Sequence, residues 1–178
     1  MTAKAMTADA ATATAAPAVP IAIDLLVEAG AWPAEEALAA LIARAVEASF
    51  AEARLKVVKG SELSVVFTDD AHIRELNEAW RQKDKATNVL SFPGSPPGRG
   101  RYGPLIGDIV VAAETVQSEA EADGIAFEDH LTHLLVHGLL HLFGHDHIED
   151  VEAERMEALE TAILGRLGIA DPYAERAP

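Results

Sequence analysis

The sequence predicts an α+β fold, a single compact domain in which a four-stranded mixed sheet packs against about five helices. The main observation is that four short apolar stretches alternate with segments whose apolar residues recur at helical spacing. The second is size, since 178 residues suit one domain and a hydrophobic content of 49% is enough for a sizeable core.

The N-terminal part contains a tail, a strand and a helix. Residues 1–18 are low-complexity Ala and Thr without the apolar core of a signal peptide, which predicts a disordered tail before a domain spanning 19–168. The stretch "PIAIDLLVE" alternates well enough for a first strand beginning near Val19. Pro33 suits the first turn of a helix, and "AEEALAALIARAVEASFAE" follows it at helical spacing.

The middle of the chain predicts two strands around one helix. "LSVVFTDD" is a strand that ends in an N-cap at Asp69 or Asp70, and it leads into the helix "AHIRELNEAWRQ". "TNVLSF" is the third strand, which Pro93 stops. The glycine- and proline-rich segment 93–104 is a loop, whose Arg99, Arg101 and Tyr102 could cover and stack on a substrate or merely connect two strands.

The C-terminal part predicts one strand and three helices. "LIGDIVVA" is the fourth strand, and the helix "ETVQSEAEAD" after it closes at Gly124. A histidine-rich helix runs from Phe127 to Gly144, and an amphipathic helix covers roughly 149–167. Residues 169–178 form a polar C-terminal tail.

Composition limits the function in three ways. Cysteine is absent, so neither disulfide partners nor thiolate metal sites are available. No apolar run is long enough to cross a bilayer, so no membrane partner is expected, and a cytoplasmic location fits. The net charge of −15 opposes a nucleic-acid partner. Segment 71–104, however, carries six basic and three acidic residues. This segment either is an ordinary solvated surface or forms a locally positive one.

The strongest signal is "HLLVHGLLHLFGHDH", which holds five of the seven histidines of the chain. His137 and His141 are four residues apart and therefore share one helix face. Gly144 permits a sharp turn, after which His147 can fold back as a third ligand. Three imidazoles leave one coordination position open, as in a catalytic site, and favour one zinc ion per chain, with nickel or another divalent transition metal as the alternative.

Gly138 decides which chemistry fits this metal site. The spacing matches the zinc-peptidase pattern H-E-x-x-H-x-x-G-x-x-H except that Gly138 replaces the glutamate. That glutamate is the general base of peptide hydrolysis, so a zinc peptidase is disfavoured. A glycine inside a helix instead indicates close approach of another segment or of substrate.

The remaining polar residues near the cluster have two interpretations each. His130 and His133 are either buried supports of the site or simple packing. His145 either contacts substrate or shuttles a proton as a catalytic residue, or is an exposed turn residue. Asp146 either orients a ligand imidazole or stabilises the turn.

The assembled motif resembles the YbeY family of metal-dependent endoribonucleases. "HGLLHLFGHDH" is similar to H-G-x-L-H-L-x-G-Y-D-H, with His145 at the tyrosine position. "LNEAWRQKDKATNVLSFP" is similar to the family's L-N-x-x-Y-R and T-D-V-L-S-F-P segments, with Trp80 for the aromatic residue and Asn88 for the aspartate. "IGDIVVAAETV" and "MEALETAIL" resemble its L-G-D-I strand and its closing helix, and the resemblance covers residues 20–168.

The resemblance implies a function and a set of site residues. It implies cleavage of single-stranded RNA in rRNA maturation and ribosome quality control, in the bacterial cytoplasm, on a compact four-stranded α+β fold. His137, His141 and His147 map onto the metal ligands, and Arg81 maps onto an arginine suited to phosphate binding. The alternative is a non-catalytic ribosome-assembly factor with a structural metal, whose acidic surface would suit basic ribosomal proteins.

Overall fold

The computed structural model describes residues 19–174 of the protein, and the predicted tail at 1–18 and residues 175–178 lie outside the described part. Within this described part, the sheet has four strands in the order β1-β2-β4-β3. β1 pairs with β2 and β2 with β4 in parallel, whereas β3 pairs with β4 in antiparallel orientation. The strands are β1 (Ile21–Val27), β2 (Ser61–Thr68), β3 (Val89–Pro93) and β4 (Leu105–Ala112).

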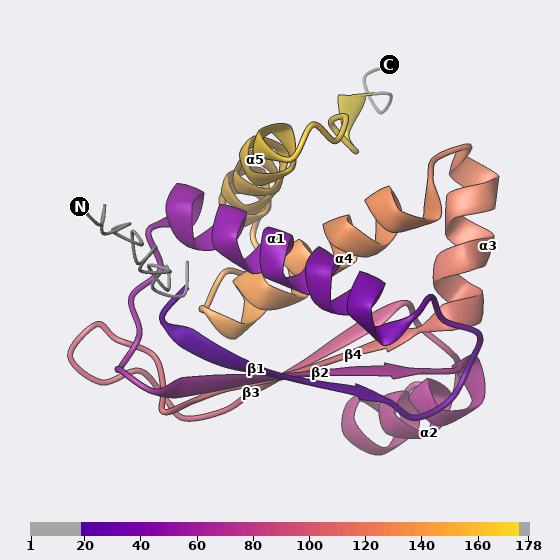
Figure 1. Ribbon diagram of the computed structural model, residues 1–178, viewed down its shortest axis with the longest axis horizontal. Helices are drawn as coiled ribbons and strands as arrows, with labels where there is room; N and C mark the ends of the chain where they lie inside the picture. The colour runs from indigo at the N-terminus through magenta and orange to yellow at the C-terminus, as the bar shows by residue number, and fades with distance from the viewer. Residues whose placement is uncertain (1–18, 175–178) are drawn as a thin grey trace, which may run out of the picture.

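Five helices among residues 19–174 complete the domain, so the predicted α+β class with one mixed sheet is confirmed. Helices α1 and α4 cover one face of the sheet with α5 packed beyond them, while α2 lies on the opposite face (Figure 1). The helices are α1 (Glu35–Ala53), α2 (Asp70–Arg81), α3 (Ala113–Asp123), α4 (Phe127–Leu142) and α5 (Asp150–Arg166). No helix among the described residues is long and apolar enough to span a membrane.

The main hydrophobic core lies between the sheet and the helices α1, α4 and α5. β2 contributes by alternation, since Leu63, Val65 and Phe67 point into this core. A smaller cluster around Ile73 and Leu90 fills the space under α2. Helix α4 is buried along most of its length, because it lies between the sheet on one side and α1 and α5 on the other.

The ends of the helices follow local sequence signals. Asp69 is the N-cap of α2, and its carboxylate accepts a hydrogen bond of 2.9 Å from the backbone N–H of His72. Helix α4 ends at Leu142, two residues before the predicted end, because Gly144 has a φ of +84° and reverses the chain instead of extending the helix. The N–H groups of Gly144 and His145 close the last turn on the carbonyls of His141 and Leu140, at 3.1 Å each.

Three irregular segments bear on the site. The turn after α4 carries His145 and His147 outward from the buried helix. In the loop before β4, the ring of Tyr102 packs on Phe143 with centroids 4.9 Å apart, so this aromatic residue belongs to the core edge. Residues 169–174 of the predicted tail lie against the domain, where Ile169 packs on the main core.

Candidate metal centre

The structure brings His137, His141 and His147 together, as the sequence predicts. One nitrogen of each imidazole lies within 4.8 Å of the others, a spacing that could hold a metal ion. His137 and His141 lie one turn apart near the end of α4, and their Nε2 atoms are 3.1 Å apart. His147 returns from the turn, and its ring centroid lies 5.6 Å from that of His137 and 5.0 Å from that of His141.

A buried carboxylate orients His137. Oε1 of Glu160, on α5, lies 2.5 Å from Nδ1 of His137, and Glu160 has no exposed surface. The Nδ1–H group donates to this carboxylate, so Nε2 keeps its lone pair toward the other two histidines. Imidazoles at about 2.0–2.1 Å from a tetrahedral ion have nitrogens roughly 3.3 Å apart, and the observed 3.1 Å is close to that value. The donor set therefore fits a zinc-type ion.

The protonation state of His141 also suits a ligand. Burial lowers the pKa of His141 from 6.5 to about 4, and the charges of His137 and His147 act in the same direction. A neutral imidazole is required for coordination, because only the unprotonated nitrogen offers a lone pair. His141 therefore has a lone pair to offer at neutral pH.

Two carboxylates hold the other histidines of α4. Oε2 of Glu160 lies 3.4 Å from Nε2 of His133 and accepts a hydrogen bond from the hydroxyl of Tyr173, which follows α5. Glu119 on α3 lies 2.7 Å from Nε2 of His130 and accepts a bond of 3.0 Å from the side chain of Asn88. His130 and His133 thus have hydrogen-bonded positions beside the cluster, in agreement with a supporting role.

The charge of Glu160 is stabilised despite its burial. Burial raises the pKa of Glu160, but hydrogen bonds from His133, His137 and Tyr173 outweigh burial and bring the pKa to about 2. Glu160 is therefore ionised at neutral pH and presents a negative charge to the back of the histidine cluster.

Gly138 allows α4 to approach the sheet closely. A Cβ atom at this position would lie 3.1 Å from Cγ2 of Ile109 and 3.1 Å from Oγ of Ser91. The hydroxyl of Ser91 donates to the carbonyl of Gly138 at 3.0 Å, which ties β3 to the helix. The position therefore faces strands β3 and β4, as expected for close approach of another segment.

The histidines line a cleft of about 610 Å³ together with both other predicted site residues, Arg81 and His145. Arg81 is the last residue of α2, and it reaches the cleft from the side of the sheet opposite to α4. Burial lowers the pKa of His145, which therefore stays neutral at physiological pH. The cleft also contains β3 residues and Asn88, which replaces the aspartate of the resembled motif.

Two neighbouring features have structural roles. The carboxylate of Asp146 accepts a 2.7 Å bond from the backbone N–H of His147, which stabilises the turn. A Cβ atom at Gly144 would lie 2.7 Å from the hydroxyl of Tyr102, so this position combines a positive φ with a close contact. Both features fix the path that brings His147 back toward the helix.

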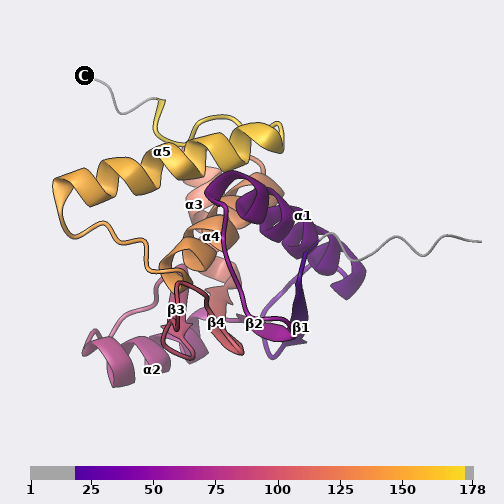
Figure 2. The same cartoon turned by 90° about the vertical axis from the view of Figure 1, so that its left-hand side faces the viewer.

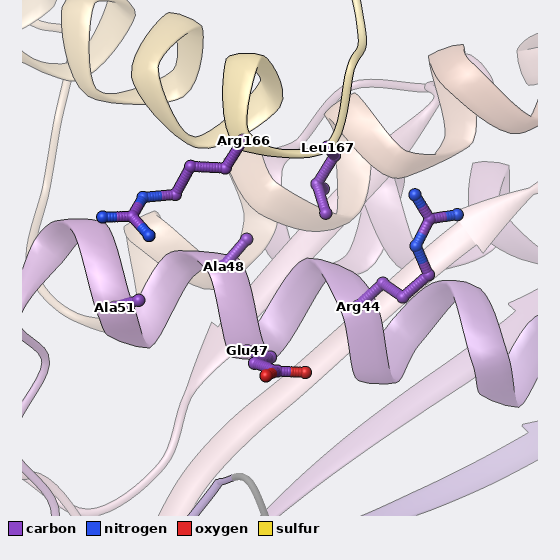
Figure 3. A pocket seen from close by; sticks show the side chains of 6 residues that line it. All are labelled: Arg44, Glu47, Ala48, Ala51, Arg166 and Leu167. Atoms are coloured by element: carbon purple, nitrogen blue, oxygen red, sulfur yellow. The ribbon is translucent and has the colours of Figure 1, made fainter.

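A second, smaller cavity of about 360 Å³ lies elsewhere, between α1 and the end of α5 (Figure 3). It is lined by alanines of α1, by Glu47, and by the arginines Arg44 and Arg166. Arg166 is already held by an ion pair with Glu52. This cavity contains no histidine and shares no residue with the cleft at the histidine cluster.

Two partners of the histidines, Glu160 and Glu119, were not predicted from the sequence. For Glu160 a signal existed, since the buried positions of α5 are Met156, Glu160, Ile163 and Leu164. A carboxylate at a core position of an amphipathic helix indicates a buried partner. Glu119 gave no such signal, because it lies on a polar helix with several other acids.

Comparison with known proteins agrees with this fold. The family described as endoribonuclease YbeY matches residues 28–168. The endoribonuclease YbeY of Rhizobium meliloti is 55% identical over 162 residues, covering 88% of this chain and 96% of the relative, and that of Agrobacterium fabrum is 55% identical over 163 residues, with the same coverage. A Thermotoga maritima protein with a known solution structure superposes with a TM-score of 0.52 at 26% identity, covering 83% of this chain and 92% of the other.

Fold and cleft together define a class of small α+β protein in which one buried helix presents histidines at the edge of a mixed sheet. Within that class, the chain belongs to the endoribonuclease YbeY family.

Proposed function

We propose that this protein is a metal-dependent endoribonuclease that cleaves single-stranded RNA during rRNA maturation and ribosome quality control in the cytoplasm. The observation that carries the proposal is the shared cleft, in which three imidazoles and Arg81 lie together in a chain of an endoribonuclease family. Cleavage of a phosphodiester needs positively charged groups next to the phosphate oxygens and a group that accepts a proton. This cleft offers both.

His137, His141 and His147 would hold one divalent ion, zinc by ligand type, with nickel as the alternative. A bound ion of this kind supplies Lewis acidity to the phosphodiester. Glu160 fixes the ring of His137 in the orientation that turns Nε2 toward the other two ligands.

Arg81 and His145 would act on the substrate itself. The guanidinium of Arg81 binds a phosphate oxygen and offsets the negative charge that develops there. His145 is neutral at physiological pH, so it can accept the proton of the attacking hydroxyl, which belongs either to water or to the substrate 2′-OH.

The position of residue 138 argues against one of the two competing functions, a zinc peptidase. In a zinc peptidase the residue here would be a glutamate pointing at the ion, but position 138 faces Ser91 and Ile109 on the sheet. A ribosome-assembly factor with a structural metal shares the fold and the rRNA and ribosomal-protein partners, and it differs from our proposal in lacking RNA cleavage.

Metal analysis combined with RNA cleavage tests the proposal. We expect about one zinc per chain in the purified protein and cleavage of a single-stranded RNA. His141→Ala should lose both, because it removes one of the three ligands, and one of the two that lie on the rigid helix. A His141→Ala protein that has lost its metal and still cuts RNA would contradict the proposal, and His72→Ala, on an exposed residue of α2, is the matched control.

A further inference from the structure

Strand β3 has a free edge. The sheet order places it last, and among residues 19–174 it pairs only with β4. In Figure 2 it lies at the outer end of the sheet, near α2. The backbone groups on this free edge follow from the pairing register.

The register shows which groups face outward. The N–H of Ala112 donates to the carbonyl of Asn88, and the N–H of Gly94 donates to the carbonyl of Ile106. In an antiparallel pair such bonded residues alternate with residues whose N–H and C=O point away from the partner strand. Asn88, Leu90 and Phe92 therefore bond to β4, whereas Val89, Ser91 and Pro93 present their backbone groups to the free edge.

In the part of the chain that the structure describes, one backbone donor remains available on this edge. The N–H of Val89 is taken by the side-chain oxygen of Asn88 at 2.7 Å, and Pro93 has no N–H. The N–H and C=O of Ser91 both point to this edge and are available for a hydrogen bond, and the carbonyl of Val89 lies beside them. Added peptide strands pair through a row of donors and acceptors, so a single donor is poorly suited to one.

This short edge lines the same cleft as the histidines. Val89, Ser91 and Pro93 belong to its wall, with the histidines of α4 on one side and Arg81 of α2 on the other. A substrate phosphate held by Arg81 next to the histidines would have its nucleotides in reach of this edge. The hydroxyl of Ser91 already donates to the carbonyl of Gly138, so the groups of Ser91 that can bind substrate are its backbone N–H and C=O.

We propose that the backbone N–H and C=O of Ser91 bind the Watson–Crick edge of one unpaired base of the RNA. The inference rests on the proposed function and deepens it. Every base has a hydrogen-bond acceptor next to a donor on that edge, so a neighbouring N–H and C=O can pair with any of the four bases. In a duplex these edges are already paired, so the contact selects single strands without selecting a sequence.

Modified RNA tests the contact without altering the protein. Chelator-treated wild-type protein is titrated into fluorescent 12-nucleotide oligouridylates made of uridine, 5-methyluridine or N3-methyluridine, and binding is followed by anisotropy. Both methyl groups add the same bulk, but only the N3-methyl group blocks the Watson–Crick edge. We expect N3-methylation to weaken binding roughly tenfold relative to 5-methylation. Equal affinities of the two methylated strands would overturn the proposal.

A pair of protein variants tests the same contact from the other side. Ser91→Ala and Ser91→Pro both lose the hydroxyl, but only the proline also loses the outward N–H, and no bond to β4 is lost. We expect Ser91→Pro to bind the uridine strand roughly tenfold more weakly than Ser91→Ala, with similar melting temperatures. Equal binding by two folded variants would contradict the proposal. If the proline variant unfolds, the comparison of the two methylated RNAs decides whether the proposal is right.

The outcomes separate this inference from the proposed function. If metal-loaded wild-type protein fails to cut any single-stranded RNA, the proposed function is wrong whatever the methylated strands show. If it cuts RNA and binds both methylated strands equally, only the role of Ser91 is wrong. Competition of the RNA by an extended peptide, with no effect of N3-methylation, would assign the edge to a peptide instead.

Discussion

Among residues 19–174, Glu160 is the only carboxylate whose side chain is buried, and it contacts two histidines at once. A buried negative charge is unfavourable unless hydrogen bonds compensate it, and here Tyr173 adds a third bond. Glu160 therefore links the stability of the domain to the orientation of a candidate ligand histidine.

Substitution of Glu160 should change the acid stability of the metal-free protein. The folded-state pKa of about 2 lies below the ordinary value of 4.5, so the unfolded chain binds the proton more readily and the stabilisation is lost as the pH falls toward 2. Each pKa unit corresponds to about 1.4 kcal/mol, which gives about 3 kcal/mol at neutral pH. We expect Glu160→Gln to be less stable by that amount at pH 7 in urea unfolding.

The pH profile separates charge from simple packing. The difference between wild type and Glu160→Gln should shrink between pH 5 and pH 2. The low pKa of His141 weakens both proteins between about pH 6.5 and 4 and cancels in the comparison. A difference that stays constant over the whole range would mean that the ionised carboxylate is not what stabilises the fold.

Arg81 should matter for RNA cleavage and not for folding. Its guanidinium lies at the end of α2 in the cleft, away from both hydrophobic cores. We expect Arg81→Glu to lower kcat/KM for single-stranded RNA by about a hundredfold or more, because it replaces a phosphate-binding cation by an anion. Metal content and the melting temperature should stay near wild type, and Arg74→Glu, on the same helix, is the control. Unaltered cleavage by Arg81→Glu would remove it from the mechanism.

At the scale of the elements, local signals explain what the sequence could predict. Strands β1 to β4 and helices α1 to α5 appear where alternation, caps and proline stops indicate them, because these signals act over a few residues. The same holds for His137 and His141, whose shared face follows from a four-residue spacing within one helix. The strand order β1-β2-β4-β3 depends on contacts between distant segments, so the local pattern did not contain it.

Contacts between elements also explain what was missed at the site. Glu160 reaches His137 from another helix, 23 residues away, and Tyr173 reaches Glu160 from beyond the end of that helix. Of the two interpretations of the loop at 93–104, the packing of Tyr102 on Phe143 and against Gly144 fits a connector between strands. A sequence pattern identifies ligands that share one helix more readily than the residues that orient them.

The packing of α4 against β3 makes a prediction about residue 138. Gly138→Glu would insert a charged side chain between the helix and Ser91 and Ile109, where a Cβ alone already lies at 3.1 Å. We expect a loss of about 2 kcal/mol or more in the free energy of unfolding and no casein degradation. For Gly138→Ala we expect a small net effect, because a gain of about 1 kcal/mol in helix propensity offsets the tight contact. A stable Gly138→Glu protein that degrades casein would favour the peptidase.

At the scale of the whole molecule, net charge should govern how RNA approaches. The chain carries −15, and on α2 the charge of Arg74 is offset by Asp84, whose carboxylate lies 2.7 Å away. At 0.01 M salt the screening length is about 30 Å. The net negative charge of the molecule is therefore expected to repel RNA at longer distances than those at which Arg81 attracts it.

Association with RNA should accordingly become faster as salt increases. In stopped-flow experiments, we expect the association rate constant for a single-stranded RNA to rise between about 0.01 and 0.15 M salt, since screening shortens from about 30 to 8 Å. An uncharged peptide nucleic acid of the same sequence should show no such change. A rate that falls with salt would show that a positive surface steers the RNA.

The three candidate ligands differ in how firmly the molecule holds them. His137 and His141 lie on a helix buried in the main core, whereas His147 lies in an exposed turn. Amide hydrogens of α4 should therefore exchange with solvent only on global unfolding, while those of residues 145–149 exchange through local opening. An ion at this site could then be captured and released by movement of one turn, on a timescale unrelated to the lifetime of the folded domain.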